Sequence, residues 1–411
     1  MNLIQPFAAL RPAPGRAADV IAPPYDVLST EEARQRAQGR PWSFLHISKP
    51  EIDLPPGTDP YAPEVYAKAR ENLDAMLAAG VLARDATPAY YVYRMVMNGH
   101  TQTGIVAAAS VADYDTNRIR KHEFTRPDKE DDRVRQIEAV NAQTGPVLLA
   151  YPDTPAVDAL LAEAAGGPPD ADAELDGVRH SLWPIRDPAL IARLTALFDA
   201  MPALYIADGH HRSAAASRIA ARRRAANPHH TGRESYNAFL AVIFPAHAMR
   251  IMDYNRVVAD LNGLDVDAFL ARVREAFAVE AADAAVHPPA PGHFGMYLSG
   301  RWYHLRIDPQ RVPADPVGRL DVSLLQDNLI GPVLGIGDPR RDKRIDFVGG
   351  IRGLGELEKR VDSGEMAVAF SLHPTRMEDL MRVADANAVM PPKSTWFEPK
   401  LADGMASHVL D

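Results

Sequence analysis

The stretch Ala207-Asp208-Gly209-His210-His211-Arg212-Ser213-Ala214-Ala215-Ala216 decides the fold of this chain. Residues 204–206 before it are aromatic and aliphatic and predict a strand, and residues 214–226 after it are rich in alanine and arginine and predict a helix. Glycine at such a junction lets backbone N–H groups approach a ligand closely. The first turn of the helix presents unpaired N–H donors and a positive dipole end. The pattern therefore predicts a phosphate site with chemistry beside it.

The side chains at this turn fit that interpretation. Arg212 offers a planar donor fork suited to phosphate, next to the glycine at position 209. The candidate catalytic groups at the same place are Asp208, His210 and His211. A histidine pair is also compatible with a structural role or a metal site, although zinc would need further ligands at suitable spacing.

A second charged segment covers residues 121–133, in which acidic and basic residues are mixed. A helix is expected to start within it, at Pro127. Thr125 or Asp128 is the expected cap of that helix. Glu123 would hold a metal or accept a hydroxyl proton, because phosphoryl transfer needs a carboxylate beside cations that face the phosphates. The cations expected to face polyphosphate are Lys121, Arg126 and Arg133. The alternative is an ordinary solvated helix face.

Strands and helices interleave along the chain, which predicts a mixed α/β or α+β class. Strands are expected at 90–96, 104–111, 146–151, 238–244, 294–298, 302–307 and 366–372, and helices at 63–79, 187–201 and 321–330. Residues 166–172 are expected to form a turn or short linker. We expect a catalytic region at 1–252, an accessory α+β domain at 253–390, and a C-terminal strap at 391–411 that returns to the active site.

Composition excludes several classes of function. The 411 residues contain no cysteine, which rules out disulfides, thiolate catalysis and cysteine-bound zinc. The net charge of -9 argues against broad nucleic-acid binding. No Walker or kinase-type glycine loop is present, so a nucleotide must be held by another device. Without a signal peptide or a long apolar run, a cytoplasmic protein without membrane contact is expected.

Residues 209–215 resemble the Gly-x-x-Arg-x-x-Ala phosphate motif of the ParB/sulfiredoxin-like superfamily. The longer form Ala-Asp-Gly-His-His-Arg is similar to the signature of a bacterial family catalogued as domain of unknown function ten-fifteen. Matching segments are spread along nearly the whole chain, at 4–7, 10–12, 22–27, 44–46, 50–51, 121–125 and 390–400.

The resemblance implies a ParB/sulfiredoxin-like nucleotide-binding core with an additional α+β domain. A similar turn occurs in free-serine kinases, which phosphorylate the hydroxyl of L-serine with ATP, ADP or pyrophosphate as donor, and Mg²⁺ would bridge the phosphates. Carried over, Gly209, Arg212 and Ser213 would bind the donor phosphates. Glu123 is the first candidate for the catalytic carboxylate and Asp26 the second. Sulfiredoxin chemistry is excluded because the turn lacks a cysteine.

Two alternatives remain at this stage. One is a nucleotide-binding regulator of the ParB type, and the other is a metal-dependent phosphohydrolase with His210 and His211 as ligands. A further pocket wall is expected near the C-terminus, at Lys393, Ser394 and Thr395. The competing interpretation of that segment is a buried strap that docks on the core. A homo-oligomer is compatible with the sequence.

Overall fold

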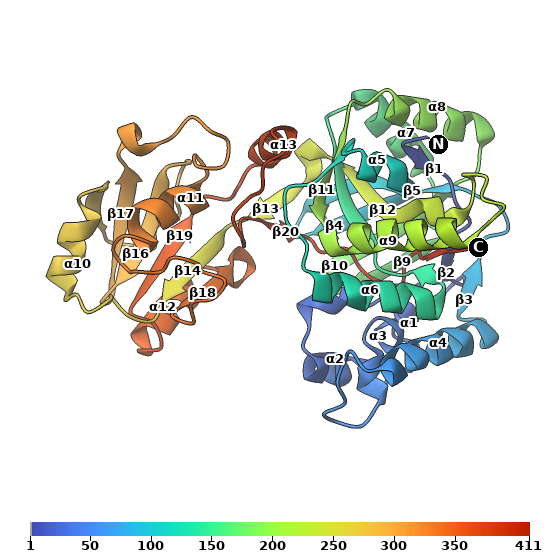
Figure 1. The fold of residues 1–411 in the computed structure, drawn as a ribbon, viewed down its shortest axis with the longest axis horizontal. Helices are drawn as coiled ribbons and strands as arrows, with labels where there is room; N and C mark the ends of the chain where they lie inside the picture. The colour runs from blue at the N-terminus through green and yellow to red at the C-terminus, as the bar shows by residue number, and fades with distance from the viewer. Residues whose placement is uncertain (1) are drawn as a thin grey trace. The chain divides into compact units, whose positions relative to one another are not determined.

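A computed structural model describes residues 2–411, and the chain divides into two compact units (Figure 1). Unit 1 runs to Met249 and resumes at Pro399–Asp411, and unit 2 is Arg250–Glu398. The chain therefore passes from one unit to the other at 249/250 and 398/399, whereas the sequence placed the boundaries at 252/253 and 390/391.

Unit 1 is built on a nine-stranded mixed sheet of order β6-β11-β8-β12-β5-β4-β10-β9, with β1 paired to β5. The strands are β1 (Ile4–Gln5), β4 (Tyr90–Met97), β5 (His100–Ser110), β6 (Ile119–Arg120), β8 (Val147–Tyr151), β9 (Ala171–Leu175), β10 (Val178–Ile185), β11 (Leu204–Asp208) and β12 (Ala238–Pro245). The pairs β6–β11 and β8–β12 are parallel, and the other pairs are antiparallel. Because β6 and β11 are parallel, their C-terminal ends lie at the same end of the sheet, and the segment at 121–133 and the turn at Gly209 follow from there.

Helices cover this sheet and enclose its core. They are α1 (Ala17–Val20), α2 (Thr30–Ala37), α3 (Leu45–Ser48), α4 (Pro63–Ala78), α5 (Val111–Asp115), α6 (Pro127–Val140), α7 (Pro155–Ala164), α8 (Pro188–Asp199) and α9 (His210–Ala226). Ala214, Ala216 and Ala220 of α9 join the core of the sheet, because small side chains let a helix approach closely. On its other side α9 packs along α6 through Ala215 and Ile219 (Figure 1).

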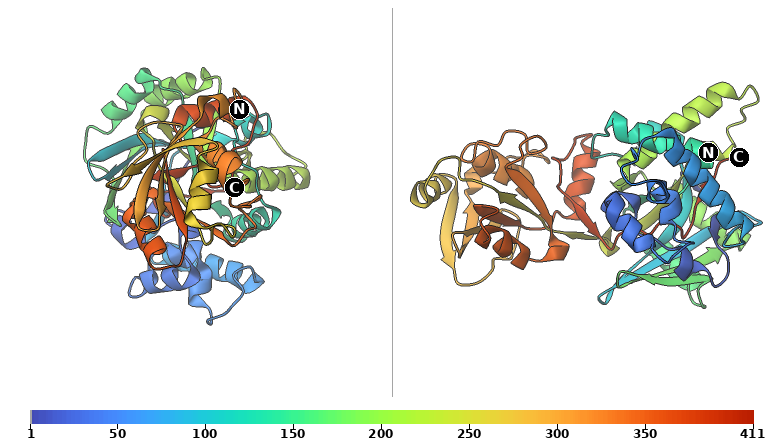
Figure 2. Two further views of the ribbon diagram at one scale, coloured as in Figure 1. Left: turned by 90° about the vertical axis from the view of Figure 1, so that its left-hand side faces the viewer. Right: turned by 90° about the horizontal axis from the view of Figure 1, so that it is seen from below.

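Unit 2 has its own six-stranded antiparallel sheet, of order β15-β17-β16-β19-β14-β18 (Figure 2). Its strands are β14 (Tyr254–Val258), β15 (Phe277–Ala282), β16 (His293–Leu298), β17 (Arg301–Ile307), β18 (Ile345–Gly349) and β19 (Val368–Leu372). Its helices are α10 (Val266–Val273), α11 (Asp321–Leu325), α12 (Gly355–Asp362) and α13 (Met377–Asp385), and α12 packs on β16 and β19. A short pair, β13 (Arg250–Met252) with β20 (Trp396–Glu398), joins the two ends of the unit.

The expected mixed α/β class is confirmed, as are the longer helices. The strands expected at 90–96 and 104–111 pair with each other, and so do those expected at 294–298 and 302–307. Residues 321–330 form α11 and a following π-helical turn, Gln326–Ile330. The expected linker at 166–172 is wrong at its end, because Ala171 and Asp172 belong to strand β9. The helix at 127 begins at Pro127 as expected, but neither Thr125 nor Asp128 caps it. No helix within residues 2–411 combines the length and apolar character that crossing a membrane requires.

Candidate functional site

The predicted strand–turn–helix is present, and its geometry depends on one glycine. The pairing of β11 with β8 shifts register between Ile206 and Asp208, so the strand is irregular just before the turn. Gly209 then adopts φ 96°, and α9 begins at His210. A Cβ on Gly209 would lie 3.3 Å from the Arg212 guanidinium carbon and from the backbone of Val147. The turn therefore requires glycine both for its backbone conformation and for space.

Arg212 is buried and already contacts several protein acceptors. Its Nη1 donates to the carbonyl of Pro146, and its Nη2 lies 3.4 Å from Asp26 Oδ2 and 3.5 Å from Asp208 Oδ2. Burial lowers the pKa of Arg212, but Asp26 and Asp208 outweigh burial and raise it above its usual range. Arg212 therefore ties the 22–29 segment to the turn, and a donor phosphate would compete with two carboxylates for its Nη2.

The C-terminal segment of unit 1 adds two charged residues to the turn. The backbones of Asp403 and Ala22 donate hydrogen bonds to each other. Burial raises the pKa of the Asp403 carboxyl to about 7, although the positive charge of Arg212 lowers it. Burial would also raise the pKa of Asp208, but Arg212 and then Lys400 lower it below its usual value. Sequence reasoning missed Asp403, because nothing local predicts that a chain end will pair beside residue 22.

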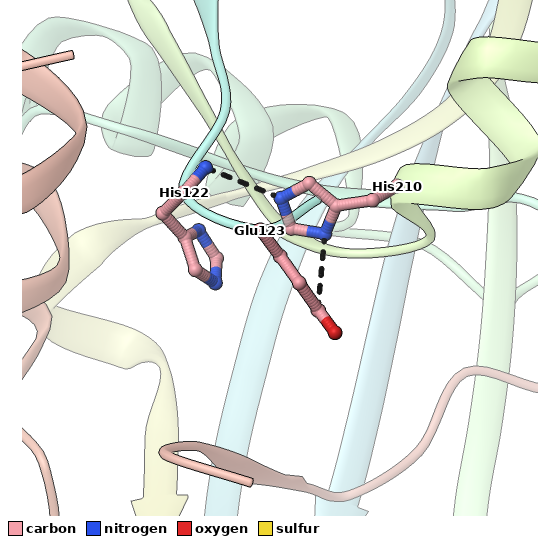
Figure 3. A group of neighbouring side chains, drawn as sticks. All are labelled: His122, Glu123 and His210. Carbon is pink, nitrogen blue, oxygen red and sulfur yellow. Dashed lines mark hydrogen bonds and ion pairs between the residues drawn. The ribbon is translucent and has the colours of Figure 1, made fainter. Parts of the chain in front are cut away.

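A second group lies at the first residue of α9 (Figure 3). His122 and Glu123 follow β6, and the His122 and His210 rings meet edge to face with centroids 4.5 Å apart. The His122 amide donates to His210 Nε2 at 3.4 Å, and His210 Nδ1 lies 3.6 Å from Glu123 Oε2. Burial lowers the pKa of His122 to about 4, and burial together with His122 holds the pKa of His210 well below its usual value. Both imidazoles are therefore neutral at pH 7.

Candidate ion ligands in unit 1 form two sets. One ligand atom from each of His122, Glu123 and His210 lies within 4.8 Å of the others, which is a mixed nitrogen and oxygen set. Asp26 and Asp208 contact the same nitrogen of Arg212 and therefore lie no more than about 7 Å apart. Their oxygens are the ligand type that Mg²⁺ prefers.

The remaining predicted residues of unit 1 make other contacts. Lys121 Nζ lies 4.0 Å from the centre of the Tyr114 ring, and burial lowers the pKa of this lysine. The exposed Arg126 side chain pairs with Asp128, while its backbone amide donates to His211 Nε2 at 3.1 Å. Ser213 is fully buried, and its hydroxyl donates to the carbonyl of His210. These contacts differ from the phosphate-facing roles that the sequence suggested.

Arg133 does lie close to the turn. Its guanidinium carbon stacks 3.8 Å above the Tyr25 ring centre, and the side chain pairs with Asp132 at 2.6 Å. Arg133, Tyr25 and Arg212 line one small cavity. Both arginines already pair with carboxylates, Arg133 with Asp132 and Arg212 with Asp26 and Asp208.

The expected pocket wall near the C-terminus belongs to unit 2. The Lys393 carbonyl accepts a hydrogen bond from Arg256, and the Lys393 ammonium lies 5.7 Å from the Tyr254 ring centre. Ser394 Oγ donates to the carbonyl of Pro391. Thr395 follows in the same loop, just before β20. A role for these three residues in the pocket therefore stays a prediction.

Comparison with known proteins yields one family. The family model described as "Protein of unknown function (DUF1015)" matches residues 4–323. No curated protein matches the sequence.

Solved structures resemble the chain only remotely. "Free serine kinase in complex with AMP" is 12% identical, with 71% of this chain and 86% of that chain covered and a TM-score of 0.33. A conserved hypothetical protein from Pyrococcus furiosus is 13% identical, with 73% and 94% covered and a TM-score of 0.33. "SbnI with C-terminal truncation from Staphylococcus aureus" is 10% identical, with 72% and 85% covered and a TM-score of 0.34.

Proposed function

Because the chain belongs to the DUF1015 family, whose function is unknown, its activity has to be inferred from the site, and we propose that it is a small-molecule phosphotransferase. The protein would transfer a phosphoryl group from ATP, ADP or pyrophosphate to a hydroxyl group of a small metabolite. Free L-serine is the first acceptor to test, because the Asp-Gly-His-His-Arg turn resembles that of free-serine kinases.

The observation that carries this proposal is the pair of carboxylates on Arg212 at the N-terminus of α9. The helix end and the guanidinium favour phosphate, whereas Asp26 and Asp208 would repel it. Because two carboxylates lie beside one guanidinium, we expect this site to bind a polyphosphate best together with a divalent cation. Mg²⁺, when bound, would offset charge on the phosphate oxygens.

The reaction needs one proton acceptor near the donor phosphate. The acceptor hydroxyl oxygen forms a bond to the terminal phosphorus of the donor, and the bond from that phosphorus to its bridging oxygen breaks. The hydroxyl proton passes to a carboxylate. Glu123 is the first candidate, because its side chain is 54% exposed beside the turn, and Asp26, 41% exposed, is the second.

The test is a direct assay of the full chain. The purified protein is incubated with Mg²⁺, L-serine and each of ATP, ADP and pyrophosphate, and O-phosphoserine is measured by mass spectrometry. We expect product with at least one donor, and loss of product in Asp26→Asn. Arg179→Ala is the control, because Arg179 is an exposed residue of β10 that pairs with Asp172 of β9. Absence of phosphoserine with all three donors would refute the serine version.

A metal-dependent phosphohydrolase is the second candidate function, and the His122, Glu123 and His210 group favours it. Water would then replace the metabolite as acceptor. Release of inorganic phosphate at the same rate with and without L-serine distinguishes this activity from phosphoryl transfer to serine.

A further inference from the structure

The His122, Glu123 and His210 group has the composition of a metal site rather than of a phosphate site. His122 and Glu123 come from the segment after β6, and His210 is the first residue of α9 (Figure 3). Two imidazoles and one carboxylate provide nitrogen and oxygen donors, with one ligand atom of each residue within 4.8 Å of the others. Imidazole ligands suit zinc and related transition ions, whereas Mg²⁺ prefers oxygen ligands alone.

One ring nitrogen of His122 carries an independent sign of a missing ligand. The side chain is 3% exposed, and its Nδ1 has no hydrogen-bond partner among residues 2–411. The ring also makes a hydrogen bond to the backbone of Ile206, so Nδ1 is the buried ring nitrogen that is left without a partner. Leaving a buried polar atom unsatisfied is unfavourable, and a metal ion would satisfy it.

The spacing of the other two ligand atoms fits an ion between them. His210 Nδ1 and Glu123 Oε2 are 3.6 Å apart, which is too long for a good hydrogen bond. Two ligands at about 2.1 Å from one tetrahedral ion are roughly 3.4 Å apart. Binding at Nδ1 would place the ring proton of His210 on Nε2, so the His122 amide, which donates to Nε2 at 3.4 Å, would need another acceptor.

We propose that His122 Nδ1, His210 Nδ1 and Glu123 Oε2 bind a divalent transition ion of the zinc type. Glu123 lies on the solvent side, so a fourth position is open to water or substrate, as in catalytic zinc sites. This ligand set replaces the expected His210 and His211 pair, because His211 Nε2 accepts from the amide of Arg126.

The site itself does not depend on the proposed phosphotransferase activity. One consequence does depend on it: with Glu123 bound to the ion, Asp26 is left as the proton acceptor for the metabolite hydroxyl.

The test is zinc binding by the full chain in the absence of substrate. The protein is stripped with a chelator, and Zn²⁺ is titrated against a chromophoric indicator, with Co²⁺ as a spectroscopic probe. We expect one Zn²⁺ per chain, visible Co²⁺ absorption typical of a tetrahedral site, and a zinc-dependent rise in melting temperature. These readouts are independent of catalysis, so failure of the kinase assay would leave them intact.

Three variants locate the ion. Glu123→Gln and His122→Asn should each weaken zinc binding at least 100-fold, because loss of an outer-sphere partner alone costs about 10–100-fold. His211→Asn is the matched control and should bind zinc like the wild type. Glu123 is half-exposed, so Glu123→Gln decides the question if His122→Asn does not fold. Substoichiometric zinc in the wild type, or unchanged affinity in Glu123→Gln, would overturn the proposal.

Discussion

At the scale of single residues, Arg212 differs most from its predicted role. The sequence indicated a donor fork directed at phosphate, but the guanidinium also holds the Pro146 carbonyl and two aspartates. A sequence motif gives the residue type at each position. It does not show which hydrogen-bond acceptors from distant segments contact that residue in the fold. Arg212 is therefore a structural residue as well as a candidate phosphate ligand.

Arg212→Ala should consequently lower stability as well as phosphate binding. Asp26 and Asp208 would lose their shared cation, and the carbonyl of Pro146 would lose a donor. Both aspartate side chains are about 40% exposed, so water would partly compensate, and we expect a loss of about 1–3 kcal/mol in the free energy of unfolding. Urea unfolding of both proteins measures this loss. Arg126→Ala, which removes an exposed ion pair, should leave the midpoint unchanged.

Asp321 in unit 2 should make stability depend on pH. Its Oδ1 accepts from the Gly292 amide at 2.7 Å, its Oδ2 has no partner among residues 2–411, and burial raises its pKa to about 7. A carboxyl whose pKa rises on folding stabilises the fold fully below about pH 4 and loses that contribution as the pH rises to about 7. Residue 321 cannot titrate in Asp321→Asn. The melting temperature of the wild type should therefore fall relative to that of the variant as the pH rises between these two values. Parallel curves for the two proteins would contradict the assignment.

At the scale of elements, the turn before α9 should tolerate only glycine. In Gly209→Ala the residue would keep a positive φ, at about 1–3 kcal/mol, and its Cβ would press on Val147 and Arg212. Gly177→Ala is the matched control, because Gly177 has φ 75° and a methyl group added there would meet no other atom within 4 Å. We expect Gly209→Ala to lose at least about 1 kcal/mol more than Gly177→Ala in chemical unfolding. Equal losses would show that Val147 and Arg212 do not restrict the turn.

Local patterns predicted most elements, and they failed where turn-forming residues precede a strand or where the pairing partner is distant. The hairpin β4–β5 follows from Asn98-Gly99, both with positive φ, and α4 follows from its apolar spacing. The β9–β10 pair escaped prediction because Gly166 and the prolines after it suggested a linker. His122 escaped for another reason: its partner His210 is 88 positions away, and only the parallel pairing of β6 with β11 brings the two together.

At the scale of the whole molecule, unit 2 interrupts unit 1. The chain leaves unit 1 after Met249 and re-enters it at Pro399. Arg250 and Glu398 are direct partners in the β13–β20 pair, so their Cα atoms are only about 5 Å apart. Adjacent ends are typical of a domain inserted into a loop. The segment at 399–411 then supplies Asp403 and Lys400 to the turn, which explains why the site residues of unit 1 come from both ends of the chain.

Removal of unit 2 should therefore leave a folded unit 1. Each unit has its own sheet and its own hydrophobic core, and a short glycine-rich linker can join Met249 to Pro399 across the narrow gap. We expect both the shortened chain and the isolated 250–398 segment to melt cooperatively in calorimetry. The shortened chain retains His122, Glu123 and His210 and should bind Zn²⁺ with the affinity of the full protein. Loss of cooperative melting in the shortened chain would show instead that unit 1 needs unit 2 to fold. A second variant that ends at Met249 lacks unit 2 and also residues 399–411. Without Asp403 beside Arg212, this variant should be less stable than the chain in which a linker joins Met249 to Pro399.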